Sequence, residues 1–164
     1  MDELEKLYLD YSDGLYKFLL YMTNDHLLAE ELLQETFFQA IKSIHTFKSN
    51  CKIKTWLYQI AKYIYYQHHT KNKINNQNFD ESLGYINEFY IPEKLLVKKE
   101  NEKLINYAIM KLKEPYKEVV ILRLYDHLSF KEIGEILSQT ENWARVTFHR
   151  GKQKLQAELK KKGD

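Results

Sequence analysis

The sequence predicts an all-α protein of two small helical domains joined by a flexible linker. Gly and Pro are scarce, with five and two among 164 residues, which disfavours a turn-rich β architecture. Hydrophobic residues recur at the i, i+3, i+4 spacing of amphipathic helices along most of the chain. This periodicity lapses in an Asn-rich segment near the middle. We therefore predict domains at residues 1–73 and 93–164, with a linker at residues 74–92.

The N-terminal domain begins with two predicted helices, at residues 4–19 and 26–46, separated by the capping residues 23–25. A helical projection at about 100° per residue places one set of the second helix in the core: Ala29, Leu33, Thr36, Phe37 and Ala40. Its outward face carries Glu31, Gln34, Glu35 and Phe38. A large apolar ring among carboxylates suggests a docking surface for another protein. The alternative is that Phe38 packs under a neighbouring helix.

A third helix is predicted at residues 55–69. Its core stripe comprises Leu57, Ile60, Ala61 and Ile64, and its opposite face carries Tyr58, Lys62, Tyr65, Tyr66 and His69. Rings interleaved with cations suit the stacking of unpaired bases. The loop before the helix adds Phe47, Lys48, Asn50 and Lys52, and could pocket an extruded base. Alternatively, the tyrosines cover a small helical bundle.

Charge is segregated along a chain whose net charge is only +2. Residues 36–79 contain no acidic side chain but seven lysines and nine aromatic residues, and residues 138–164 carry seven Lys and Arg against three acids. Such basic zones attract polyanions and indicate contact with nucleic acid. The alternative is that these are solvated helical faces that keep the protein soluble.

The C-terminal domain has the pattern of a helix-turn-helix. Helices are predicted at residues 93–112 and 115–125, with Pro115 in the first turn of the latter. Ser129 and Glu132 then form a capping box for a short helix that ends at Leu137. A further helix begins after Thr140, and Gly134 allows the two helices to approach closely.

Projection of the last helix separates a core stripe from a basic face. Ala144, Phe148, Gly151 and Leu155 point inward. The candidates for base-edge contacts are Asn142, Arg145, Val146 and His149, near the start of the helix. Thr140 precedes them, and Arg150, Lys152 and Lys154 are candidates for phosphate contacts. The alternative is a basic amphipathic helix that only faces solvent.

Other chemistry is not supported by the sequence. Cys51 is the only cysteine and the histidines are scattered, so we expect no metal site, disulfide or cofactor. No paired carboxylates or phosphate-binding glycine loop suggests an enzyme or a small-molecule substrate. The absence of a membrane span or signal pattern predicts a cytoplasmic protein.

These motifs together resemble bacterial RNA polymerase sigma factors of the extracytoplasmic-function (ECF) group of the sigma-70 family. Residues 29–37 and 55–61 resemble sigma domain two, and residues 112–123, 129–137 and 149–155 resemble sigma domain four. The resemblance covers nearly the whole chain in the right order and spacing.

The resemblance implies a role for each surface. The outward face of residues 29–40 would bind the β′ clamp helices of core RNA polymerase. The loop at residues 47–52 and the third helix would recognise and open the minus-ten promoter element. Domain four would read the minus-thirty-five element as duplex DNA and contact the β flap. A cognate anti-sigma factor is also implied, which could hold the protein at the membrane.

Two stretches depart from the family pattern, one in the third helix and one in the last. Tyr63 and the run of aromatic and His residues at 65–69 stand where relatives usually have Asn and then arginines, which shifts the expected contacts toward stacking. Thr147 occupies the place of a usual arginine, whereas Arg145 takes the place of a lysine. The competing hypothesis is an autonomous helix-turn-helix regulator whose N-terminal domain senses a ligand or dimerises.

Overall fold

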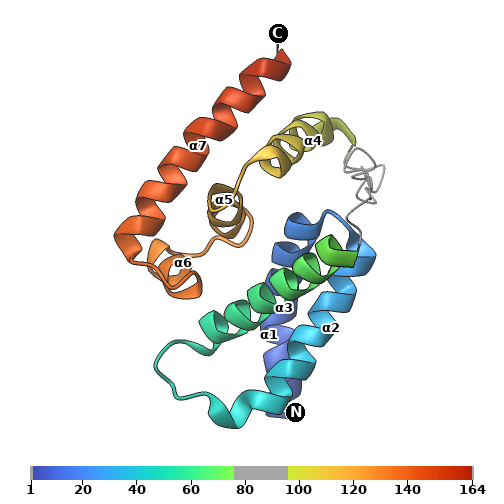
Figure 1. The fold of residues 1–164 in the computed structure, drawn as a ribbon, viewed down its shortest axis with the longest axis vertical. Helices are drawn as coiled ribbons and strands as arrows, with labels where there is room; N and C mark the ends of the chain where they lie inside the picture. The colour runs from blue at the N-terminus through green and yellow to red at the C-terminus, as the bar shows by residue number, and fades with distance from the viewer. Residues whose placement is uncertain (1, 76–95, 164) are drawn as a thin grey trace. The chain divides into compact units, whose positions relative to one another are not determined.

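The computed structural model describes residues 2–75 and 96–163, which form two compact helical units (Figure 1). Unit 1 contains α1 (Glu3–Thr23), α2 (His26–Ser43), the 3-10 turn η1 (Ile44–Thr46) and α3 (Ile53–Asn75). Unit 2 contains α4 (Leu96–Lys111), α5 (Tyr116–Leu124), α6 (Phe130–Ile136) and α7 (Glu141–Gly163). The described residues contain no β-strand, so the all-α prediction is confirmed. The predicted linker lies outside them, except for its first two residues, which belong to α3.

The turn between α1 and α2 forms as its residues predict. Asn24 adopts a left-handed conformation with φ 55°, and its N–H donates to the carbonyl of Leu20 at 2.7 Å. The Asp25 carboxylate then accepts from the N–H groups of Leu27 and Leu28, at 3.1 and 3.2 Å. Both helix ends therefore satisfy backbone groups that would otherwise lack partners.

In unit 1, all three helices contact one another around a small core. The predicted inward residues of α2 are all buried, and Leu32 joins them. The core side of α3 is wider than predicted, because Thr55 and Tyr58 are buried together with Leu57, Ala61 and Ile64. Ile60, expected in the core, is only half-buried.

The core of unit 2 is centred on α5, which packs against α4, α6 and α7. Val119, Val120, Ile121 and Leu122 are fully buried there. Pro115 is the N-cap of α5, one residue before the place predicted for it. The α7 helix crosses α5 at Gly151, where an added Cβ would lie 2.9 Å from Val120 Cγ2. The predicted inward stripe of α7 is buried throughout.

The turn between α6 and α7 depends on Gly134. The Gly134 carbonyl accepts from the N–H of Gln139 at 2.7 Å, and an added Cβ would lie 2.8 to 2.9 Å from backbone atoms of Gln139 and Thr140. The predicted capping box is also present, with Ser129 Oγ accepting from the Glu132 N–H and Glu132 Oε1 from the Ser129 N–H, each at 3.1 Å. The predicted helix-turn-helix is therefore confirmed.

Candidate nucleic-acid interface

The α2 outer face, defined as Glu31, Gln34, Glu35 and Phe38, is exposed in all four members. Phe38 is 62% exposed, so it does not pack under a helix of the described chain. The ammonium of Lys42 lies 5.3 Å from the centre of its ring. Leu27 and Ile41, which are 67% and 49% exposed, extend this face and were missed by the sequence reasoning. Their spacing to Glu31 and Phe38, in steps of three and four, is the signal that would have found them.

The loop between η1 and α3 presents mainly polar and cationic side chains. Lys48, Asn50 and Lys52 are exposed, whereas Phe47 is half-buried. The Phe47 ring lies 5.3 Å from the ring of Trp56, in the first turn of α3. Trp56 is itself half-buried and was not among the predicted site residues. An aromatic pair thus borders a cationic loop, an arrangement suited to stacking on a base.

One member of the predicted aromatic face of α3 points inward. Tyr58 is 2% exposed and its ring lies 5.8 Å from that of Phe18 on α1. The prediction that Tyr58 faces solvent as a stacking residue is therefore wrong. Gly14 explains the burial, because a Cβ on Gly14 would come within 2.6 Å of the Tyr58 hydroxyl. Gly14 on α1 leaves room for the Tyr58 ring, which the helical projection placed on the solvent-facing side of α3.

The other α3 candidates form a ring cluster, comprising Tyr65, Tyr66 and His69. Tyr65 stacks on His69 at 5.8 Å and meets Tyr66 edge-on at 5.1 Å. The Tyr65 hydroxyl also donates to the Met22 carbonyl at 3.3 Å, which ties the cluster to the end of α1. His69 is exposed, and both tyrosines and Lys62 are partly exposed. Tyr63, at 60% exposure, lies outside this cluster.

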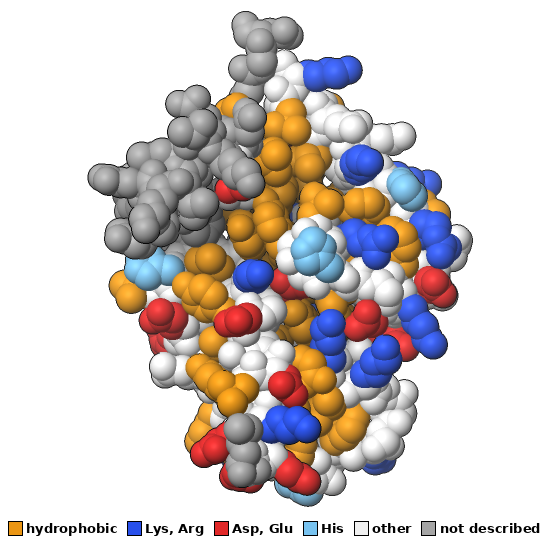
Figure 2. Space-filling view, turned by 180° about the vertical axis from the view of Figure 1, so that it is seen from behind, with side chains coloured by type: hydrophobic (Ala, Val, Ile, Leu, Met, Phe, Trp, Pro, Cys, Tyr) orange, Lys and Arg blue, Asp and Glu red, His pale blue; other side chains and the backbone are white. Residues whose placement is uncertain are grey.

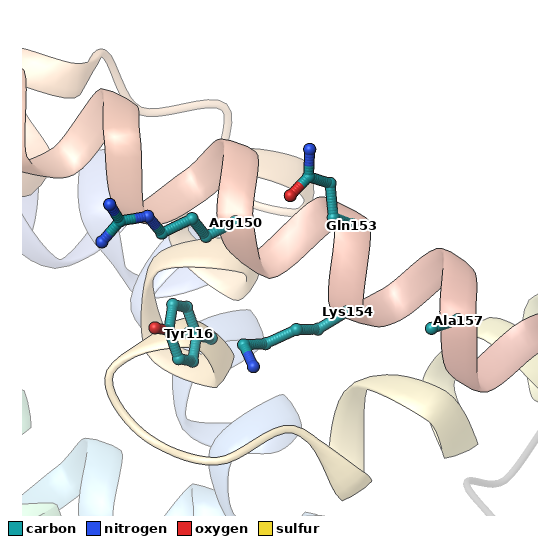
Figure 3. A pocket seen from close by; sticks show the side chains of 5 residues that line it. All are labelled: Tyr116, Arg150, Gln153, Lys154 and Ala157. Atoms are coloured by element: carbon teal, nitrogen blue, oxygen red, sulfur yellow. The ribbon is translucent and has the colours of Figure 1, made fainter.

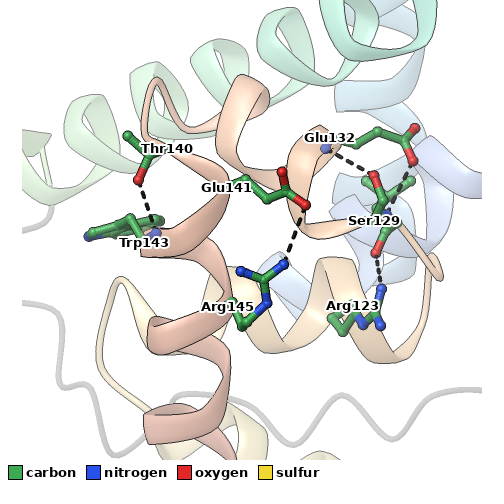
Figure 4. A network of polar contacts seen from close by, with 8 residues as sticks. Arg123, Ser129, Glu132, Thr140, Glu141, Trp143 and Arg145 are labelled. Atoms are coloured by element: carbon green, nitrogen blue, oxygen red, sulfur yellow. Dashed lines mark hydrogen bonds and ion pairs between the residues drawn. The ribbon is translucent and has the colours of Figure 1, made fainter.

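The start of α7 presents the predicted base-edge candidates to solvent. Asn142, Arg145, Val146 and His149 are all exposed. Thr140 is exposed too, and its hydroxyl oxygen caps the helix by accepting from the Trp143 N–H at 3.0 Å (Figure 4). Thr147, which departs from the family pattern, is 6% exposed, so its side chain lies in the core.

Farther along α7, the phosphate-contact candidates Arg150, Lys152 and Lys154 are also exposed. Arg150 and Lys154 line a shallow pocket of about 490 Å³ with Gln153, Ala157 and Tyr116 of α5 (Figure 3). The Lys154 ammonium lies 5.0 Å from the centre of the Tyr116 ring. On the face of the molecule seen in Figure 2, hydrophobic side chains lie among charged ones.

Two absences concern the described residues alone. In residues 2–75 and 96–163, no three His, Cys, Asp or Glu side chains are grouped so that they could hold a metal ion. In the same part of the chain, no helix combines the length and the apolar character that crossing a membrane requires.

The fold and these surfaces define a two-unit helical protein with a DNA-binding helix-turn-helix. Residues 7–74 match Sigma-70 region 2, and residues 103–155 match Sigma-70 region 4. The chain therefore belongs to the sigma-70 family of RNA polymerase sigma factors. Its function is to direct RNA polymerase to promoters, and its partners include core RNA polymerase and promoter DNA.

The similarity to individual sigma factors extends over almost the whole chain. RNA polymerase sigma factor YlaC of Bacillus subtilis is 29% identical over 98% of this chain and 94% of the relative. ECF RNA polymerase sigma factor SigM of the same organism is 30% identical over 94% of this chain and 93% of the relative, and this similarity assigns the chain to the ECF group. Among solved structures, the sigma factor RpoE of Bartonella quintana, in complex with the anti-sigma factor NepR, has a TM-score of 0.76. It is 21% identical and covers 98% of both chains, which supports the fold.

Proposed function

We propose that the chain divides promoter-directed initiation among three surfaces. The α2 outer face binds core polymerase, α3 and its preceding loop engage the minus-ten element, and α7 reads the minus-thirty-five element. The observation that carries this proposal is that region 2 and region 4 match in order along the chain. The exposure of most candidates on each surface is consistent with it. The autonomous regulator is not favoured, because it does not account for a region 2 match.

The α2 outer face fits a helical partner. Leu27, Glu31, Gln34, Phe38 and Ile41 recur in alternating steps of four and three residues, which is the spacing of a helix that packs along another helix. An exposed phenylalanine among polar neighbours can serve as a binding anchor. The β′ clamp helices are the proposed partner.

The α3 surface supports strand opening without catalysis. The proposed contacts are Phe47, Lys48, Asn50, Lys52, Lys62, Tyr65, Tyr66 and His69, and the role first predicted for Tyr58 is withdrawn. Stacking of an unpaired base on an aromatic ring contributes about 1–3 kcal/mol. This free energy offsets part of the cost of separating the strands, and the lysines attract the phosphates of the displaced strand. No bond is made or broken by the protein in this scheme.

The α7 surface combines sequence readout with phosphate binding. Asn142, Arg145, Val146 and His149 lie on the first turns of the helix, the part that enters the major groove in helix-turn-helix proteins. Arg150, Lys152 and Lys154 follow and provide salt-sensitive affinity for the backbone. Contact of this unit with the β flap completes the proposed polymerase complex.

Regulation by an anti-sigma factor in the cytoplasm is the remaining part of the proposal. The RpoE structure of Bartonella quintana contains the anti-sigma factor NepR, and the CnrH structure contains the cytosolic domain of CnrY. Because their sigma chains share this fold, we propose that a partner of the same class controls the present chain.

In vitro transcription with core RNA polymerase, with and without this chain, tests the function. We expect promoter-specific transcripts from genomic templates only when the chain is present. Tight binding of the isolated chain to palindromic duplex DNA as a symmetric dimer, without such transcripts, would favour the autonomous regulator.

A further inference from the structure

A carboxylate lies at the end of α7 that the proposed function places in the major groove. Glu141 is the first residue of α7, and 53% of its side chain is exposed. The first residues of a recognition helix lie nearest the base edges. A negative charge at this place is repelled by the phosphates and lowers affinity for DNA of any sequence. It can contribute to binding only where a donor on a base meets it.

Glu141 is paired with Arg145, one of the four candidates for base readout. Its Oε1 accepts from Arg145 Nη2 at 3.4 Å, four residues along the helix (Figure 4). A guanidinium has five N–H donors in a planar fork, so this bond leaves enough donors for a bidentate contact with guanine O6 and N7. The carboxylate also retains lone pairs for a second donor.

The Arg145 guanidinium is held from a second side by an aromatic ring. Phe130, the first residue of α6, has its ring centre 5.5 Å from the Arg145 guanidinium carbon. The Arg123 guanidinium lies 4.2 Å from the same ring, and Arg123 donates to the Leu128 carbonyl at 2.9 Å. Phe148 contacts the ring as well, at 5.7 Å. Arg145 therefore contacts both a supported ring and the Glu141 carboxylate.

We propose that Glu141 is a specificity-determining residue of the helix-turn-helix. It holds Arg145 toward a guanine and accepts a hydrogen bond from the N4 amino group of a neighbouring cytosine. Cytosine is the partner because its major-groove edge offers only an amino donor, from which carboxylates accept. Guanine and thymine edges offer acceptors, and adenine places the N7 acceptor beside its amino group, where it would repel a carboxylate. The inference rests on the proposed function, since it requires that α7 enters the groove.

A structural role for Glu141 makes a different prediction. An acidic residue in the first turn interacts favourably with the helix dipole, and an i, i+4 pair adds a few tenths of a kcal/mol to an isolated helix. Loss of such a role changes binding to all sequences alike. Only a specificity role changes the preference at the base pairs that Glu141 and Arg145 contact.

The test is selection of promoters with a randomised minus-thirty-five region by reconstituted holoenzyme, comparing wild type with E141A and E141Q. We expect the wild-type preference for cytosine at one position to fall about tenfold in E141A, with a smaller loss of preference at the neighbouring guanine that Arg145 contacts and the remaining positions unchanged. E141Q should shift that position toward adenine, because a glutamine carboxamide can bond both N6 and N7 of adenine. Binding to nonspecific DNA should strengthen in both variants, since a negative charge is removed.

The matched control is E158A. Glu158 is also in an ion pair of α7, with Lys161 at 3.6 Å; its side chain is 29% exposed and lies far from the N-terminal turns. This variant should leave the selected sequences unchanged. A uniform effect of E141A on all sequences, or no effect, would overturn the inference while leaving the function of α7 intact. If wild-type holoenzyme selects no minus-thirty-five sequence at all, the proposed role of α7 fails and the inference falls with it.

Discussion

The α3 and α7 helices carry the two proposed DNA-binding faces, and they differ in how much of the helix surface is buried where those faces lie. α3 packs against both α1 and α2, so its buried arc is wide and includes Tyr58. The N-terminal turns of α7 leave one broad face free, and each of its predicted contact residues is exposed. Helical projection therefore worked for α7, whereas in α3 it placed Tyr58 outside and Ile60 in the core. A single hydrophobic stripe describes the N-terminal turns of α7, which keep a broad face exposed, but not α3, whose buried arc includes Tyr58.

The largest expected effect separates the buried ring of α3 from the exposed ones. Tyr58→Ala removes a ring that contacts Phe18 and should lower the free energy of unfolding of unit 1 by about 3–5 kcal/mol. Tyr58→Phe should cost only about 1 kcal/mol, because the ring remains.

The two tryptophans, Trp56 in unit 1 and Trp143 in unit 2, allow each unit to be followed by fluorescence in a single-tryptophan background. Tyr63→Ala is the matched control in α3, because Tyr63 is 60% exposed and should change stability by about 0.5 kcal/mol or less. Equal losses for Tyr58 and Tyr63 would contradict the difference in burial.

The ring cluster of α3 should matter for strand opening more than for assembly. Replacing Tyr65 and Tyr66 by Ala should remove about 1–3 kcal/mol for each base that stacks on them. Permanganate footprinting of the holoenzyme should then show less open complex, with binding to core polymerase almost unchanged. Phe38→Ala is the control with the opposite expectation, since it should weaken binding to core polymerase and leave strand opening by the assembled holoenzyme intact. Equal loss of both activities in the tyrosine variant would indicate that the rings are structural, as the bond from Tyr65 to Met22 also permits.

A third change tests the turn that presents α7. Gly134→Ala places a Cβ within 2.8 Å of backbone oxygen, and should destabilise unit 2 by about 1–3 kcal/mol, as other overpacking substitutions do. Transcription that depends on the minus-thirty-five element should fall with it. Lys131 on the same short helix is exposed, so Lys131→Ala should change the free energy of unfolding very little. A fully stable Gly134→Ala protein would show that the turn is not closely packed.

The smallest expected effect is on the alkaline pH dependence of the two units. Burial lowers the pKa of Lys117 in α5, although Glu114 and Glu118 oppose the shift. Between this lowered pKa and 10.5, the unfolded chain binds more protons than the folded one, so the stability of unit 2 rises with pH.

Tyr16 in unit 1 has the opposite sign. Burial raises its pKa, with a smaller contribution from Glu30, so above pH 10.0 the unfolded chain loses this proton first and unit 1 loses stability. Urea midpoints against pH, read from each tryptophan, check both slopes. Lys117→Met should flatten the rise in unit 2 and leave unit 1 unchanged; a persistent rise would assign the linkage to another group.

Local sequence signals predicted most of the fold. The Asp25 cap, the Ser129 capping box and Gly134 were predicted because each acts on backbone groups within a few residues. Helix ends were less exact, since α3 continues to Asn75 rather than ending near residue 69. Trp56 was missed because its ring contact with Phe47 across a loop depends on packing. Leu27 and Ile41 were missed although their helical spacing to Glu31 and Phe38 is readable in the sequence.

The sequence by itself determined the class of this protein, because the sigma motifs and the amphipathic periods of both units are readable along the chain. It also determined the outward residues of α2 and α7, which follow from helical geometry. Only the tertiary structure decided that Tyr58 is buried, that Tyr65 is tied to Met22 and that Phe130 braces Arg145. These contacts join residues on different helices, and their geometry arises when the helices pack together.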